Sequence, residues 1–457
     1  MTSLPFLAAP SQRKHTALLV AMRLTCMAVY SFALFVLLRD YAAIVWPFYG
    51  YSFSSPGLVG GLQVVFFIAS ASWLCPPEIR SPSTLILLIV YLFVVVPSII
   101  CLFYMDPRYS GQPTLTSFFI VIGYAGARFL SRSARPVEVV EVRKPHFLLI
   151  PGMMALSAIL LAFLYWRFGG VMSFVALDSI YEQRERGAAQ NFVEGYAQTY
   201  SQYVLSTGLL AVGLVYRKPF AVILGLFGSV SNYMITAEKA GLMYPAFIVV
   251  LYIVLSTRLR FLRGLAFISL SLAAIVLFSV WNYQRSQIAE FSAWYLGMRT
   301  ILTPGALVVH YLNFFESIGN TFFSHVRGLN FFVPPPTAFA NDVRFPEIGV
   351  IIGEDYFNFP KLNANASFLA SDGIASLGLL GIPIVFALLG LLLRGLDAVS
   401  RGVGKAALLI LLPIALTLTN GSLFTVLASF GGLFWILVLR FCFLTRAEPT
   451  LRGVPDR

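Results

Sequence analysis

The chain has 457 residues, of which 58% are hydrophobic and only 11% are Asp, Glu, Lys or Arg. Soluble domains carry roughly 25% charged residues because their surfaces must be hydrated, so this composition excludes an ordinary soluble protein. A net charge of +12 would suggest nucleic acid as the partner of a soluble chain, but in a membrane protein excess Lys and Arg mark the cytoplasmic side. We therefore expect an all-α, polytopic membrane protein with no nucleic-acid partner.

Apolar runs of about the length of a membrane-spanning helix, roughly 20 residues, follow one another along the whole chain. Twelve runs approach this length: 17–38, 56–75, 83–104, 112–131, 147–168, 196–216, 219–237, 240–257, 262–281, 373–393, 406–420 and 422–445. The sequence therefore predicts a single membrane domain, residues 1–457, with about 12 transmembrane helices.

The charged residues predict the orientation of these helices. If the N-terminus is cytoplasmic, the inner segments and adjacent helix ends hold 21 of the 32 Lys and Arg residues, including the basic clusters at 128–144 and 258–263. The outer segments hold most of the Asp and Glu residues. By the positive-inside rule, both termini are expected in the cytoplasm.

Two outer loops are longer than the others, at residues 169–195 and 282–370. Loops of this length are uncommon unless they are functional or disordered. The second loop is rich in aromatic residues, so we expect it to fold as a lid on the outer face. Within it, residues 300–315 form an apolar segment interrupted by Pro304 and Gly305 and too short to span, which predicts a re-entrant or interfacial helix.

Two groups of charged residues beside the membrane could bind an anion. In the first long loop, Arg184 and Arg186 are spaced to clamp a phosphate, since guanidinium groups bind phosphate oxygens in pairs. The alternative is a hydrated helix in which Glu182 and Arg186 form an i,i+4 ion pair. Lys239 follows Glu238 in a tight outer turn, where such a pair could instead be an interfacial anchor.

Two further groups lie in the second long loop. The first consists of Arg285, Arg299, His310, Tyr311, Glu316, His325 and Arg327. His310 is the notable member because polar groups at membrane depth are costly and are usually functional, although it could equally be a structural hydrogen-bonding residue. The second consists of Asp342, Arg344, Glu347, Glu354, Asp355, Lys361, Asn363, Asn365 and Asp372, whose acids could bind or deprotonate a sugar hydroxyl or simply be hydrated.

Three stretches of the sequence resemble a known family. They are FGGVMSFVALDSIYEQRERG (168–187), GMRTILTPGALVVHYLNFFES (297–317) and IGEDYFNFPKLNANASFLASDGIASLGLLGI (352–382). Together with the order of helices and long loops, they resemble the O-antigen or oligosaccharide repeat-unit polymerases of bacterial inner membranes. The resemblance implies a multi-pass inner-membrane protein whose active face is periplasmic.

The resemblance also implies a reaction and roles for the candidate residues. A growing glycan would be transferred from its polyprenyl diphosphate carrier to a hydroxyl of a second lipid-linked repeat unit. The implied diphosphate-binding residues are Arg184, Arg186, Lys239, Arg285 and Arg327. The implied catalytic residues are Arg299 and His310, with Glu354 or Asp355 as substitutes for the base, and the implied sugar-binding residues are Trp294, Tyr311 and Asn363.

The expected partners are the lipid-linked donor and acceptor, membrane lipid and, as an optional addition, a chain-length regulator. The four cysteines show no paired spacing, so no zinc site is indicated, and the resemblance implies a metal-independent reaction without a cofactor. Polyprenyl diphosphate is already a good leaving group, so no strong general acid is required. Two other functions stay open. An O-antigen ligase would use the same donor, and a polysaccharide or lipid-linked sugar transporter would belong to a different functional class.

Overall fold

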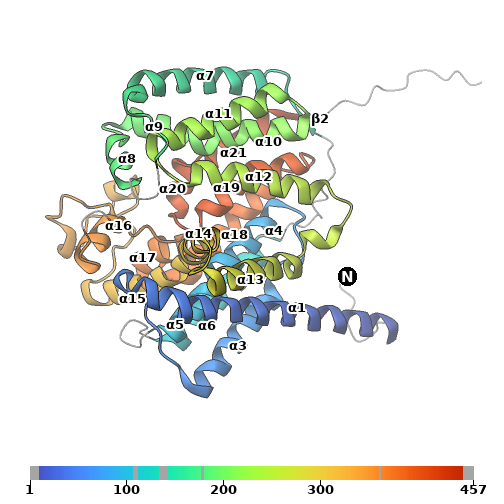
Figure 1. Cartoon of the computed structure of the whole chain (residues 1–457), viewed down its shortest axis with the longest axis vertical. Helices are drawn as coiled ribbons and strands as arrows, with labels where there is room; N and C mark the ends of the chain where they lie inside the picture. The colour runs from blue at the N-terminus through green and yellow to red at the C-terminus, as the bar shows by residue number, and fades with distance from the viewer. Residues whose placement is uncertain (1–9, 106–111, 133–142, 176–179, 360–361, 446–457) are drawn as a thin grey trace, which may run out of the picture.

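The computed structural model describes residues 10–105, 112–132, 143–175, 180–359 and 362–445 (Figure 1). Several residues considered above, including Lys361 and the basic residues of 133–142 and 446–457, lie outside these ranges. The described chain is mostly helical, and its strands are two three-residue segments that pair antiparallel, with Arg143 opposite Thr445.

The first half of the chain forms α1 (Pro10–Leu37), α2 (Ala43–Val45), α3 (Gly57–Leu74), α4 (Pro82–Val90), α5 (Val96–Tyr104), α6 (Pro113–Leu130), β1 (Arg143–Pro145), α7 (Leu149–Phe168), α8 (Ile180–Arg186), α9 (Phe192–Tyr200), α10 (Thr207–Tyr216) and α11 (Pro219–Thr236). The second half forms α12 (Ala240–Ser256), α13 (Leu265–Asn282), α14 (Gln287–Ser292), α15 (Thr303–Ile318), α16 (Ile348–Ile351), α17 (Ala375–Leu377), α18 (Gly381–Val399), α19 (Lys405–Thr417), α20 (Leu423–Ala428), α21 (Gly432–Phe441) and β2 (Phe443–Thr445). π-Helical segments join several of these helices, among them Tyr91–Val95, Ser201–Ser206, Ala293–Leu302 and Leu369–Ile374.

Eight helical stretches of the described chain are long and apolar enough to cross a membrane. They are Val20–Val45, Gly57–Leu74, Pro82–Tyr104, Pro113–Leu130, Leu149–Val171, Pro219–Thr236, Leu265–Asn282 and Leu369–Val399. The other four predicted runs are also helical, as α9 with α10, α12, α19, and α20 with α21, but they are shorter, interrupted or less apolar. The all-α, membrane-spanning character is therefore confirmed, whereas the number of twelve crossings stays a prediction.

Several helices begin where the local sequence requires it. Ser81 caps α4 in a capping box with Thr84, and Pro82 occupies the first turn, where its missing N–H costs nothing. Asn191 caps α9 by accepting a hydrogen bond from the backbone N–H of Glu194. These caps fix the helix starts independently of the membrane.

The helices pack side by side in an elongated bundle (Figure 1). Extensive pairwise packing joins α1 to α13, α6 to α18, α10 to α11 and α5 to α15. At the last of these contacts the backbones approach closely, because a Cβ added at Gly305 would lie 2.3 Å from the carbonyl carbon of Pro97. Only glycine fits this position of α15.

Pro304 and Gly305 do not interrupt the helix that the sequence predicts around residues 300–315, and its re-entrant or interfacial position stays a prediction. Residues 287–318 are helical throughout, as α14, the π-helical segment Ala293–Leu302 and α15. Pro304 lies in the first turn of α15, where the π-helical segment before it already alters the hydrogen-bond pattern. The segment is buried against α5 and the π-helical segment Leu369–Ile374.

The connections between helices gather at two opposite ends of the bundle. At one end, which we call the α8 end, the Tyr51 hydroxyl lies 2.8 Å from Thr303 Oγ1, and Gln183 Nε2 donates to the carbonyl oxygen of Met234 at 2.8 Å. At the other, the strand end, the backbone N–H of Arg143 donates to the carbonyl oxygen of Gly402 at 2.7 Å. Figure 1 shows α8 and α16 at the left and β2 at the right.

The segments expected on the outer side of the membrane thus meet at the α8 end, and those expected on the inner side meet at the strand end. The direction of the whole bundle in a membrane rests on the charge distribution and stays a prediction.

Candidate functional site

Helix α8 is fixed to the end of α11 by Gln183. This side chain is buried, and its amide nitrogen donates to the carbonyl oxygens of Val171 and Met234, each at 2.8 Å. Gly187 follows α8 and packs closely against the same end of α11. A Cβ at this position would lie 1.9 Å from the carbonyl oxygen of Ile235. The half-buried Arg184 of α8 is thereby held beside the turn between α11 and α12.

Lys239 occupies that turn and points at aromatic rings. Its Nζ lies 3.3 Å from the ring centroid of Trp294 and 5.4 Å from that of Tyr295, both in the π-helical segment Ala293–Leu302. A cation over an aromatic face is attracted by the negative face of the ring. This contact ties the α11–α12 turn to the segment that also carries Arg299.

Arg184 and Arg299 lie within electrostatic range of Lys239. Partial burial, together with the charges of Arg184 and Arg299, lowers the pKa of Lys239 to about 7. Burial raises the pKa of Tyr295 to about 12, although Arg299 and Arg184 both act in the opposite direction. Arg184, Lys239 and Arg299, which come from three separate segments, are called the cation cluster below. Three positive charges held close together favour binding of a multivalent anion.

Aromatic and acidic side chains border the cation cluster. Trp294 stacks on Trp46 with ring centroids 6.3 Å apart and an interplanar angle of 19°. On the other side, the carboxylate of Glu238 accepts hydrogen bonds from the Tyr203 hydroxyl at 2.9 Å and from Gln202 Nε2 at 3.2 Å. The site thus combines cations, one carboxylate and flat apolar surfaces, which suits a ligand with phosphate and sugar groups.

The other predicted diphosphate-binding arginines take no part in the cluster. Arg186 pairs with Glu182 at 2.5 Å, which is the i,i+4 alternative considered from the sequence, and both side chains are mostly exposed. Arg327 pairs with Glu347 at 3.3 Å, again at an exposed position. Arg285 lies exposed in the turn that follows α13. Two of these three charges are therefore balanced locally.

The predicted base His310 is enclosed in the protein. It is 1% exposed on α15, its Nδ1 lies 3.4 Å from the Tyr356 hydroxyl, and its ring packs edge-on against Phe357. A Cβ added at Gly50 would lie 2.5 Å from the ring, so backbone covers it directly. Burial lowers the pKa of His310 to about 4. It is placed as a neutral structural residue and not as a base facing the cation cluster.

Two predicted sugar-binding residues also lie away from the cluster. Tyr311 is 1% exposed, and its hydroxyl donates to the carbonyl oxygen of Ala364 at 2.9 Å, so its ring has no free face for a sugar. Asn363 is exposed, and its Oδ1 lies over Gly349, where a Cβ would approach to 2.3 Å. Of the predicted sugar-binding residues, only Trp294 borders the cation cluster.

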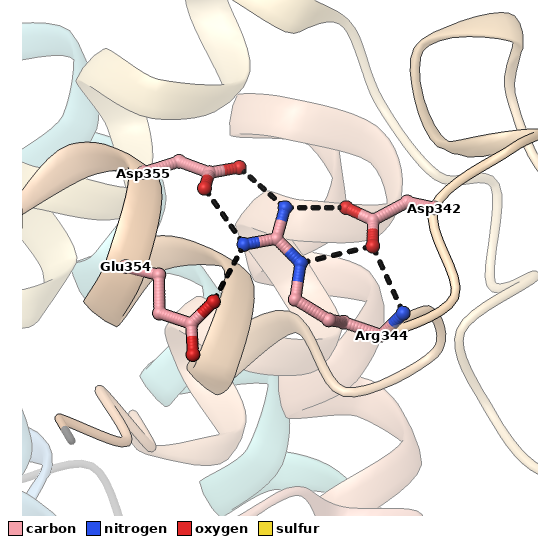
Figure 2. Close-up of polar contacts among 4 residues, drawn as sticks. All are labelled: Asp342, Arg344, Glu354 and Asp355. Carbon is pink, nitrogen blue, oxygen red and sulfur yellow. Dashed lines mark hydrogen bonds and ion pairs between the residues drawn. The ribbon is translucent and has the colours of Figure 1, made fainter. Parts of the chain in front are cut away.

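The acids Glu354 and Asp355 are engaged by Arg344 (Figure 2). Arg344 Nη1 donates to Glu354 at 2.9 Å and to Asp355 at 2.7 Å, while Nη2 and Nε bind Asp342 at 2.7 and 2.9 Å. Hydrogen bonds from Arg344 hold the pKa of Asp342 below its ordinary value. Arg344 thus joins three carboxylates from two parts of the loop, which closes the segment 342–355.

Two residues of the site were not singled out from the sequence. Trp46 lies in a short connection with no motif, and Tyr203 lies inside an apolar run that predicts only a membrane helix. Glu238 was singled out together with Lys239 as a charged pair, but without a role of its own. The signal for this pair in the sequence was an acidic residue next to a basic residue in a tight turn between two apolar helices. Their partners could not be inferred because they lie on other helices.

Comparisons with protein-family models, with curated proteins and with solved structures found no match. The resemblance to the repeat-unit polymerases therefore rests on the sequence stretches quoted above.

Proposed function

We propose that the protein is a membrane glycosyltransferase that joins polyprenyl-diphosphate-linked oligosaccharide repeat units. The growing glycan leaves its lipid diphosphate carrier and is transferred to a hydroxyl of an incoming lipid-linked unit. The reaction takes place at the α8 end of the bundle, which faces the periplasm of a bacterial inner membrane. In this arrangement the chain crosses the membrane about 12 times and both termini are cytoplasmic.

The cation cluster is the observation that carries this proposal. When the anomeric bond of the donor breaks, negative charge accumulates on the departing diphosphate. Preorganised cations stabilise such charge most effectively where water is partly excluded. Arg184, Lys239 and Arg299 supply three positive groups at one place, and burial together with the other two cations lowers the pKa of Lys239.

The aromatic surroundings support a glycan-bearing lipid as the ligand. Trp46 and Trp294 present stacked rings beside the cluster, and flat rings of this kind pack against the apolar faces of sugars and lie at membrane interfaces. Because the donor carries its own diphosphate leaving group, no nucleotide and no metal is needed in the proposed step. Activity should accordingly persist in the presence of a chelator.

The test uses purified protein in lipid nanodiscs with synthetic lipid-diphosphate-linked repeat units. Arg184→Ala and Arg299→Ala should each reduce polymer formation by at least about a hundredfold, since a single stabilising donor contributes about 10² to 10³ in rate. Arg186→Ala and Arg327→Ala are matched controls, because they remove arginines that lie in exposed ion pairs, and they should retain wild-type activity. Wild-type polymer from Arg184→Ala and Arg299→Ala would refute the site.

Deletion in a cell that makes a surface polysaccharide separates the polymerase from a ligase. Loss of the polymerase leaves single repeat units on the acceptor lipid. Loss of a ligase would instead leave lipid-linked polymer and no surface glycan, and this outcome would reassign the same donor site to the ligation reaction.

A further inference from the structure

We propose that Glu238 is the catalytic base that accepts the proton of the acceptor hydroxyl. This inference rests on the proposed glycosyl transfer at the cation cluster and assigns the one step for which the sequence left the residue undecided.

The carboxylate of Glu238 is oriented by two side chains of the segment Ser201–Ser206. The Tyr203 hydroxyl donates at 2.9 Å and Gln202 Nε2 donates at 3.2 Å, and both bonds reach Oε2. Within the described chain, Oε1 accepts no hydrogen bond, so it can accept one from a ligand. A carboxylate that is held at one oxygen and open at the other has the arrangement that a general base requires.

Tyrosine hydroxyls and charged side chains from the neighbouring elements act on Glu238. Tyr203 belongs to the segment Ser201–Ser206, Tyr244 to α12 and Tyr295 to Ala293–Leu302, and the charge of Glu238 acts on all three hydroxyls. The charged neighbours are Lys239 in the same turn and, across the cluster, Arg184 and Arg299, which act on the same Tyr295.

Glu238 is also adjacent to the leaving-group site. It directly precedes Lys239 in the chain, and it lies within electrostatic range of Tyr295, as do Arg184 and Arg299. The donor diphosphate on the cation cluster and an acceptor hydroxyl at Oε1 would therefore occupy neighbouring positions. The bases expected from the sequence are engaged elsewhere. His310 is enclosed in the protein, and Glu354 and Asp355 are bound to Arg344.

The step exchanges one bond at the anomeric carbon for another. The oxygen of the acceptor hydroxyl forms a bond to the anomeric carbon of the donor, and its proton passes to Glu238. The bond between the anomeric carbon and the diphosphate oxygen breaks, and its electron pair leaves with the diphosphate, held by Arg184, Lys239 and Arg299. Glu238 then releases the proton to water, and the products are the elongated glycan and the lipid diphosphate.

The first experiment measures transfer by Glu238→Gln in nanodiscs. Glutamine can still accept the hydrogen bonds from Tyr203 and Gln202 but cannot take a proton. Transfer to a sugar hydroxyl should fall by about a hundredfold or more, the usual contribution of a general base, while donor binding stays within about threefold of the wild-type value.

An anionic nucleophile provides the decisive control, because azide needs no base. Glu238→Gln should form the glycosyl azide as fast as the wild-type protein, whereas Arg299→Ala should lose transfer to both azide and sugar. If Glu238→Gln also lost transfer to azide, or kept transfer to sugar, the assignment of Glu238 would be overturned. If the wild-type protein formed no polymer, the proposed function itself would fail, which is a separate result.

Tyr203→Phe tests the assignment without changing the carboxylate. Loss of the hydrogen bond that orients the carboxylate should slow transfer to a sugar hydroxyl and leave transfer to azide unchanged. Tyr244→Phe is the matched control, since Tyr244 contacts the Tyr203 ring but its hydroxyl pairs with Thr417. Equal ratios of sugar transfer to azide transfer in Tyr203→Phe and Tyr244→Phe would overturn the proposal.

Discussion

The lowered pKa of Lys239 predicts that the protein takes up a proton when the lipid-linked donor binds. In the free protein, burial and the charges of Arg184 and Arg299 lower its pKa to about 7. A bound diphosphate adds negative charge beside the ammonium group and favours its protonated form, so it raises this pKa. Binding should therefore be strongest below pH 7 and should weaken as the pH rises.

The size of the effect follows from the pKa. Lys239 is protonated in about nine molecules in ten at pH 6 and in about one in ten at pH 8. If the anion binds the protonated form, the dissociation constant should rise about tenfold between these pH values. His310 and His325 do not interfere, because burial lowers the pKa of each to about 4, below this range.

The assay is equilibrium binding to protein in nanodiscs at constant ionic strength. The ligand should carry sugar on its diphosphate, since a terminal phosphate itself titrates at about pH 6 and would obscure the effect. Lys239→Arg stays charged throughout this range and should bind with little pH dependence. Lys239→Met should bind weakly at every pH. A flat profile for the wild-type protein, or an unchanged slope in Lys239→Arg, would refute the reasoning.

Two further predictions concern stability. Arg344→Ala removes the guanidinium that joins Asp342 to Glu354 and Asp355. The segment 342–355 should therefore lose about 1–3 kcal/mol of local stability and be cleaved faster in limited proteolysis. An unchanged cleavage rate would contradict this prediction. Arg143 donates to carbonyl oxygens at the ends of α18 and α21, at 2.8 Å for both Val399 and Leu439. Arg143→Ala should therefore lower the free energy of unfolding in detergent by about 2–3 kcal/mol. Arg143→Lys should not restore it, because an ammonium group cannot reach several carbonyl groups at once.

The local features of this chain follow from its sequence. Each of the twelve apolar runs forms mainly helix, because hydrophobic length is a property of consecutive residues. The helix starts at Ser81 and Asn191 follow from side chains that bond backbone groups within three residues. The helix continues through Pro304, since the preceding π-helical segment accommodates the missing N–H.

The composition of the site, in contrast, was settled by packing between distant segments. Among the candidate cations, Arg184 and Arg186 look equivalent in the sequence, but they lie two positions apart on α8 and so face different surroundings. Arg186 pairs with Glu182, while Arg184 lies near Lys239. Likewise, a histidine in an apolar helix could be exposed or enclosed, and only its packing against Gly50 and Phe357 shows that His310 is covered.

The sequence alone determined that the protein is a helical membrane protein and which segments carry its charges. The tertiary structure decided which of those charges meet, because α8, the α11–α12 turn and the segment Ala293–Leu302 are brought together only at the end of the bundle. Hydropathy and capping act between neighbours along the chain. Convergence of Arg184, Lys239 and Arg299 depends on which helices pack against each other, and no local pattern in the sequence encodes that packing.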